Sequence, residues 1–202
     1  MPAEEDASFC ALCCTCVVQI LLLVMIILLL AYAMLDPVRF TVRDASLARF
    51  ALRSSNNGTA PALAYDLALT VAVQNPNWAM RAVHAAPLDA DLLFAGRRFC
   101  GARLVPASSG RSVDPEKSDE IRVRAAGEAA ADVVLGSDGV AELVKETVAG
   151  QLESLELKLS GKVRYRPVHV GSYRLHVTCP LRLPMPGTSG NVVVLDKVIK
   201  CH

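Results

Sequence analysis

Four cysteines lie close together near the start of the chain, and their thiols offer the widest chemistry in this sequence. Cys10, Cys13, Cys14 and Cys16 immediately precede a long apolar run. Cysteines beside a membrane segment are typical sites of S-palmitoylation, which we expect at one or more of these four positions. The C-x2-C-x2-C spacing also resembles part of an iron–sulfur motif, but such a cluster needs a fourth ligand and a folded scaffold, and this flank offers neither. Chemically inert cysteines at the membrane edge are the remaining alternative.

The other residues capable of catalysis do not form a recognisable set. The sequence has no G-x-S-x-G nucleophile motif, no phosphate-binding P-loop and no G-x-G-x-x-G motif. Asp89 and Asp91 share one face of an expected strand, where a carboxylate pair without a partner is usually solvated. Metal-ligand spacing is absent among the four histidines, which are His84, His169, His176 and His202. We therefore expect no cofactor, no metal and no enzymatic activity.

Basic residues alternate along one expected strand near the C-terminus. Lys162, Arg164 and Arg166 fall on one strand face because side chains alternate with period two. Neighbouring strands can add four more cationic side chains, namely Lys158, Arg174, His176 and Arg182. This face is either solubilising surface charge or a binding surface for an anionic partner. We expect Trp78, the single tryptophan, to cap the core rather than to bind a ligand.

An apolar segment from Val17 to Leu35 separates the cysteines from the rest of the chain. It contains no charge, Gly or Pro, and as a helix it would be about 28 Å long, close to the thickness of a bilayer core. We predict a transmembrane signal anchor at 17–35, a cytosolic tail at 1–16 and a juxtamembrane strand and loop at 36–60. A cleaved signal peptide ending near Ala31-Tyr32-Ala33 is the alternative, although the apolar run is long and the N-terminal region is acidic.

Residues 61–202 have the pattern of one β-rich domain. Short alternating segments recur between turn signals, which predicts an antiparallel sandwich with strands that include 64–73, 88–95, 132–135 and 173–179. We expect a loop at 108–120 and a turn at Gly161. One helix is expected after Gly139, with Val140, Leu143, Val144 and Val148 packed inward. The fold class is therefore a single transmembrane helix followed by an all-β sandwich with one accessory helix.

Two sets of features disagree about the side of the membrane on which this domain lies. Asn57-Gly58-Thr59 is an N-glycosylation sequon, and lipidated cysteines would place the tail in the cytosol. Both features favour an extracellular domain. All 21 basic residues and 17 of the 20 acidic residues follow position 35, which gives this part a net charge of +4. The basic residues beside the apolar segment favour a cytosolic domain, whereas the modest net charge argues against a nucleic-acid partner.

The order of these features resembles that of the plant NDR/HIN-like proteins, of the late-embryogenesis-abundant group-two class related to the water-stress-and-hypersensitive-response domain. A cysteine cluster and an apolar helix precede a β-rich domain with Asn75-Pro76-Asn77 after its strongest strand. The segments 161–166 and 173–179 resemble the closing hairpin of that family. Two family features differ here, since basic residues beside the cysteine cluster are missing and residues 99–103 replace an aromatic-rich segment.

The resemblance implies an immunoglobulin- or fibronectin-like domain held outside the plasma membrane, with roles in defence and stress responses. It also implies a disulfide between Cys179 and Cys201, which leaves Cys100 either buried or available to crosslink a homo-oligomer. The expected partners are the membrane, an unidentified adhesion or signalling protein, and either anionic lipid or cell-wall polysaccharide at the basic strand. A membrane-tethered lipid-binding or lipid-transfer module is the alternative function, which an open groove between the sheets would favour.

Overall fold

The computed structural model describes the backbone of residues 3–33, 35–53, 61–106, 109–167, 171–186, 193–195 and 198–202. Side chains are described over the same ranges except at 3–14, 31–33 and 193–195. The chain forms two compact units, Met1–Pro37 and Val38–His202. Asn57, the residue of the predicted glycosylation site, lies outside the described residues.

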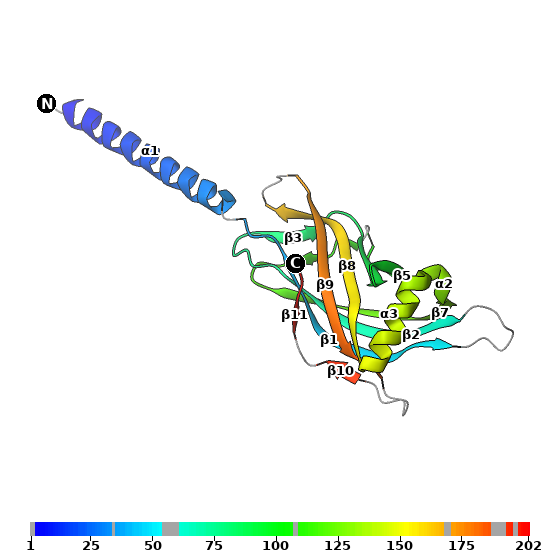
Figure 1. The fold of residues 1–202 in the computed structure, drawn as a ribbon. Helices are drawn as coiled ribbons and strands as arrows, with labels where there is room; N and C mark the ends of the chain where they lie inside the picture. Colours follow the sequence, from blue (N-terminus) through cyan, green and yellow to red (C-terminus); the bar gives the residue numbers. More distant parts are fainter. Residues whose placement is uncertain are drawn as a thin grey trace. The chain divides into compact units, whose positions relative to one another are not determined.

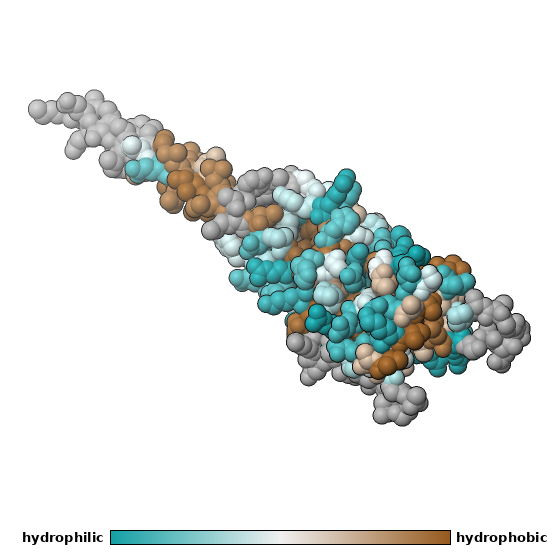
Figure 2. Space-filling model, in the orientation of Figure 1, coloured by the Kyte–Doolittle hydropathy of each residue, from teal (hydrophilic) through white to brown (hydrophobic). Residues whose placement is uncertain are grey.

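The first unit is built around one helix, α1 (Ala3–Ala33). Pro37 lies just beyond it, consistent with the inability of proline to continue a helix. The helix includes the cysteine cluster, so it begins earlier than predicted and ends before Leu35. Its described middle is hydrophobic (Figure 2), and large apolar side chains such as Leu21 and Leu28 are more than half exposed. Among the described residues, no helix meets both the length and the apolarity needed to cross a membrane. The transmembrane part of the prediction is therefore not confirmed.

The second unit is a sandwich of two antiparallel sheets (Figure 1), as the period-two pattern predicts. The strand order in the first sheet is β10-β1-β2-β7, and β11 also pairs with β1. Both long neighbouring pairs, β1 with β2 and β2 with β7, are antiparallel along almost their whole length. The bounds are β1 (Arg39–Arg53), β2 (Ala62–Gln74), β7 (Ser118–Ala130), β10 (Val193–Leu195) and β11 (Ile199–Lys200).

The second sheet is organised around one long strand, β8 (Gln151–Arg166). On one side β8 pairs with β4 and, further along, with β3; on its other side it pairs with β9. The edges are completed by β5 beside β4 and by β6 beside β3. The remaining bounds are β3 (Arg81–His84), β4 (Leu88–Phe94), β5 (Arg97–Val105), β6 (Ser112–Val113) and β9 (Tyr173–Pro184).

Apolar side chains from both sheets fill the space between them. Leu47 of β1, Val71 of β2 and Leu157 of β8 are fully buried. Aromatic rings also pack against one another in this core. The ring centroids of Phe50 and Phe94 lie 5.4 Å apart, with the two rings tilted. Such contacts add to the free energy gained by burying apolar surface.

Two helices follow β7 without an intervening loop. They are α2 (Ala131–Val134) and α3 (Gly136–Ala149). The prediction of a strand at 132–135 is wrong, because the chain turns into α2 once β7 has ended. The predicted helix is present as α3, but its inward face differs from the expected one. Leu143 is buried, whereas Val144 is 51% exposed and Val148 is 85% exposed.

The structure differs from the sequence-based prediction at one expected loop and one expected turn. The expected loop at 108–120 contains β6 and the first residues of β7. Gly161 does not turn the chain, because β8 continues straight through it and forms its hairpin with β9. A Cβ atom at Gly161 would lie 3.2 Å from the carbonyl oxygen of Pro87. This glycine therefore permits the connection from β3 to β4 to approach β8 closely.

Candidate functional site

The basic residues predicted from the sequence lie on the outward side of the second sheet. Lys162 and Arg166 are exposed and Arg164 is half-buried, while the alternating residues Val163 and Tyr165 face the core. Strand register brings further cations to this surface, because Arg174 of β9 lies opposite Lys162 and Arg81 of β3 lies opposite Arg166. We define the basic face by five residues, which are Arg81, Lys162, Arg164, Arg166 and Arg174.

Ion pairs neutralise the part of this sheet surface around β4 and β5 but leave most of the basic face uncompensated. Further along the sheet, Asp89 pairs with Arg103 and Asp91 pairs with Arg98, both at 2.9 Å. Within the basic face, Arg81 contacts Asp114 at 2.7 Å. In the described part of the chain, no carboxylate lies within ion-pair distance of the other four cations, which are Lys162, Arg164, Arg166 and Arg174.

The register places like charges directly opposite each other at two positions. Arg81 faces Arg166 and Lys162 faces Arg174 across neighbouring strands. Such pairs destabilise a sheet, whereas opposite charges in the same places would stabilise it. An anion bound between these side chains would remove the repulsion. Arg81 already pairs with Asp114, so the uncompensated cost in folding free energy falls mainly on the Lys162–Arg174 pair unless the basic face meets further negative charge.

The other basic residues expected to join this surface behave differently. His176 lies opposite Ser160, next to the Lys162–Arg174 pair, and is exposed. Lys158 lies 3.9 Å from Glu156. Arg182 lies near the opposite end of β9, beyond Leu181, which pairs with Leu155. The structure thus adds Arg81, which the sequence analysis missed because its proximity depends on the pairing of β3 with β8.

The Asn-Pro-Asn segment forms an internal clamp and offers no exposed binding group. The Asn75 side chain is fully buried, and its Nδ2 donates to the carbonyl oxygens of Met80 at 2.7 Å and Val113 at 3.1 Å. Its Oδ1 accepts a hydrogen bond from Nδ2 of Asn77 at 2.9 Å. The motif therefore fastens the end of β2 to the start of β3 and to β6, which is a structural role.

Trp78, directly after this clamp, is exposed rather than packed into the core. Its side chain is 64% exposed, so the expectation of a core-capping tryptophan is wrong. Tyr173 at the start of β9 is also 44% exposed, and its ring lies 5.7 Å from that of Tyr165. Two aromatic side chains thus lie at the surface near the ends of β2 and β8.

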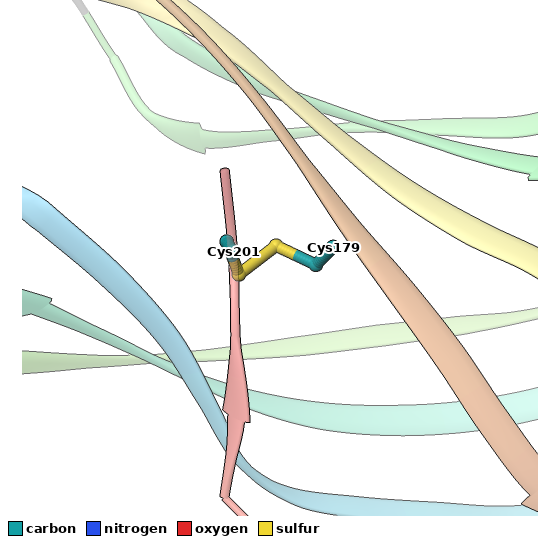
Figure 3. Close-up of a disulfide and its surroundings, with 2 residues drawn as sticks. All are labelled: Cys179 and Cys201. Carbon is teal, nitrogen blue, oxygen red and sulfur yellow. A yellow bond between two sulfur atoms is a disulfide. The ribbon is translucent and has the colours of Figure 1, made fainter.

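Cys179 and Cys201 are joined by a disulfide (Figure 3), with their Cα atoms 4.3 Å apart. The backbone of the same segment bonds to both sheets, because the N–H of Cys201 donates to Phe40 O and His202 exchanges two hydrogen bonds with Thr178. The C-terminal segment therefore links β1 of one sheet to β9 of the other.

The remaining cysteines have no disulfide in the described part of the chain. Cys100 is a half-buried free thiol, and it contributes with burial to raising the pKa of the neighbouring Tyr65 hydroxyl. Cys16 is free and exposed, while the side chains of the other three cluster cysteines lie outside the described residues.

One buried histidine lies beside a charged pair, His84 with Arg111 and Asp119. Burial lowers the pKa of His84, and the nearby Arg111 guanidinium lowers it further. Hydrogen bonds from Arg111 lower the pKa of Asp119. Across the described side chains, no three His, Cys, Asp or Glu residues are grouped as a metal site would require.

These observations define a class of protein: an apolar N-terminal helix followed by a disulfide-linked antiparallel β-sandwich with a basic outer face. No family model matches the chain. The sequence is 27% identical over 168 residues to NDR1/HIN1-like protein 10 of Arabidopsis thaliana, covering 81% of this chain and 69% of that protein. The chain is therefore similar to a member of the NDR1/HIN1-like family.

A comparison of folds gives a weaker likeness. The crystal structure of a protein from Archaeoglobus fulgidus aligns with 73% of this chain and 98% of its own length, at 10% sequence identity. The TM-score is 0.30, which does not establish a common fold.

Proposed function

We propose that this protein is a non-enzymatic, membrane-anchored binding protein of plant defence and stress responses, whose sandwich recognises an anionic group on its partner. The uncompensated basic face carries this proposal. Among the described residues, four cations without an ion-pair partner lie together there, whereas Asp–Arg pairs neutralise the part of the same sheet around β4 and β5. The similarity to an NDR1/HIN1-like protein supports the biological setting, since the resemblance implies roles in defence and stress responses.

The anchoring part of the proposal rests on α1. Its described side chains from Val17 to Leu30 are predominantly apolar on every side of the helix. A helix that is apolar all round is typical of a protein interior or of a membrane. We infer that 17–35 is a signal anchor in the plasma membrane with the sandwich outside. The Cys179–Cys201 bond supports this side of the membrane, since structural disulfides persist in oxidising compartments.

Lipid transfer through an open groove lacks a supporting observation among the residues that the structure describes. Between the sheets, an internal gap lined by residues such as Val38, Val73 and Val163 is too small to hold even a water molecule. The fully buried Leu157 and Leu159 fill the adjacent core. A filled core favours binding at the outer surface over lipid transfer.

Retention on a polyanionic resin tests the basic face. The full chain in detergent micelles is bound to dextran sulfate and eluted with salt, alongside the variant Lys162→Gln/Arg164→Gln/Arg166→Gln. A matched control removes three exposed positive charges elsewhere, as Arg49→Gln/Arg97→Gln/Arg182→Gln. We expect the first variant to elute at clearly lower salt than the wild type and the control. Equal elution of the two variants would contradict a localised anion-binding face.

A further inference from the structure

The basic face lies at one particular end of the sandwich, the end at which the chain enters the domain. The backbone N–H of Val38 donates to the hydroxyl oxygen of Tyr165 at 3.0 Å. Tyr165 stands between Arg164 and Arg166 in β8. The first residue of the domain therefore lies at the end of β8 that carries Arg164 and Arg166, on the core-facing side of the sheet, and we call this part of the sandwich the entry end.

Trp78 belongs to the same end. Arg39 at the start of β1 pairs with Gln74 at the end of β2, so the segment after Gln74 lies where the chain enters. The clamp formed by Asn75 holds this segment through buried hydrogen bonds to Met80 and Val113. Trp78 is therefore exposed because it follows a turn that the Asn75 hydrogen bonds hold in place. Tyr173, opposite Val163 near the end of β8, adds a second exposed ring.

We propose that the entry end docks onto the phospholipid headgroups of the bilayer in which the apolar segment is anchored. The basic face would contact lipid phosphates, and Trp78 would enter the interfacial layer. Tryptophan and tyrosine are enriched at this depth because their rings are apolar while the indole N–H or phenol hydroxyl stays hydrated. The inference rests on the proposed function and names the anionic group that the basic face recognises.

The covalent structure of the chain fits this partner. Only Asp36 and Pro37 separate the proposed membrane segment from Val38. In the proposed arrangement, the entry end is therefore the end that the chain tethers to the bilayer. An acidic polysaccharide would also attract the cations, but it would not provide an apolar layer for Trp78. The combination of exposed aromatic rings and unpaired cations favours the lipid surface.

Because Trp78 is the only tryptophan of the chain, its fluorescence reports on this position alone. We would reconstitute the full chain in vesicles of phosphatidylcholine with a fraction of phosphatidylglycerol. Quenching by phospholipids brominated near the headgroup would be compared with quenching by aqueous acrylamide. We expect strong bromine quenching, weak acrylamide quenching and a blue-shifted emission. In Lys162→Gln/Arg164→Gln/Arg166→Gln we expect acrylamide access to return, whereas Arg49→Gln/Arg97→Gln/Arg182→Gln should behave as the wild type.

A second reporter controls for non-specific proximity to the vesicle. Val133 of α2 is 74% exposed and follows the end of β7 that pairs with the start of β2, at the opposite end of the sandwich. In the Trp78→Phe/Val133→Trp variant, the emission should remain accessible to acrylamide and unaffected by brominated lipid. Bromine quenching of this reporter equal to that of Trp78 would overturn docking by the entry end.

The outcomes separate this inference from the proposed function. If wild-type Trp78 stays accessible to acrylamide while the chain still binds dextran sulfate through the basic face, headgroup docking is wrong and anion binding stands. Added oligogalacturonate that binds the vesicle-anchored chain in that case would identify polysaccharide as the partner. Loss of both behaviours would overturn the two proposals together.

Discussion

At the scale of single residues, the buried Asn75 side chain joins the end of β2 to the start of β3 and to β6 through its hydrogen bonds. Asn75→Ala removes a donor shared by the carbonyls of Met80 and Val113 and leaves Asn77 without its Oδ1 acceptor. Because unpaired buried polar groups are costly, we expect the free energy of unfolding to fall by about 3 kcal/mol. Urea unfolding of the full chain in detergent micelles, followed by circular dichroism, measures this loss. Trp78→Ala is the neighbouring control, and an equal loss there would contradict the clamp.

His84 gives the domain a dependence on pH with a definite sign. Its folded-state pKa is lowered, mainly by burial, so between the unfolded value near 6.5 and the folded value the unfolded chain binds more protons. The free energy of unfolding should therefore fall as pH decreases from 7 through this range. Asp119, whose pKa is lowered by Arg111, adds a separate loss below its ordinary value of 3.8.

Thermal unfolding at pH 7 and pH 5 tests the histidine contribution. In His84→Leu, the difference in unfolding temperature between the two pH values should shrink, because the titrating group has been replaced by an apolar side chain of similar size. The exposed His176→Gln serves as the control and should keep the wild-type difference. A His84→Leu variant with the full wild-type pH dependence would show that other groups are responsible.

At the scale of elements, α3 is fixed to β8 by a buried carboxylate. Glu146 is 5% exposed, and its two oxygens accept hydrogen bonds from the backbone N–H groups of Glu153 at 3.1 Å and Ser154 at 2.9 Å. These two N–H groups fall where the pairing of β8 with β9 is interrupted between Leu152 and Leu155. The side chain of Glu146 thus replaces hydrogen bonds that the sheet does not supply there.

Truncation of this side chain should weaken the contact between helix and sheet. Glu146→Ala leaves two N–H groups without their acceptor, and we expect about 2 to 4 kcal/mol less free energy of unfolding. Val148→Ala, at a position 85% exposed on the same helix, should change it by less than about 0.5 kcal/mol. Chemical denaturation of both variants provides the comparison, and similar values would refute the role given to Glu146.

The same helix shows where sequence patterning stops being informative. Its end follows from the sequence, since the left-handed conformation of Gly150 is the expected stop signal, whereas its start at Gly136 precedes the expected start after Gly139. The buried face of α3 could not be predicted from the sequence. Three- and four-residue spacing placed the valines inward, whereas in the structure Glu146 faces the sheet and accepts hydrogen bonds from backbone N–H groups. Likewise, Gly161 resembles a turn residue until the close approach of Pro87 is known.

At the scale of the whole molecule, the alternation of the long strands was sufficient to predict the sandwich, whereas the surface required tertiary information. Lys162, Arg164 and Arg166 were visible as a period-two pattern. Arg81 joins them through the pairing of β3 with β8, which local sequence does not encode. The exposure of Trp78 also depends on a clamp whose partners lie up to 39 residues from Asn75.

In the proposed membrane-anchored arrangement, the side of the membrane on which the sandwich lies decides which partners it can meet. With the domain outside, Asn57 is available for glycosylation during secretion, so expression in a eukaryotic secretory system should give a glycosidase-sensitive shift on a gel. Asn57→Gln should abolish the shift, whereas Asn56→Gln leaves the sequon intact and should preserve it. Protease protection in intact microsomes tests the orientation independently of glycosylation, since an extracellular domain lies in the lumen and resists digestion. Digestion of the sandwich would place it in the cytosol, as the arginines after position 35 favour, and would refute the extracellular arrangement.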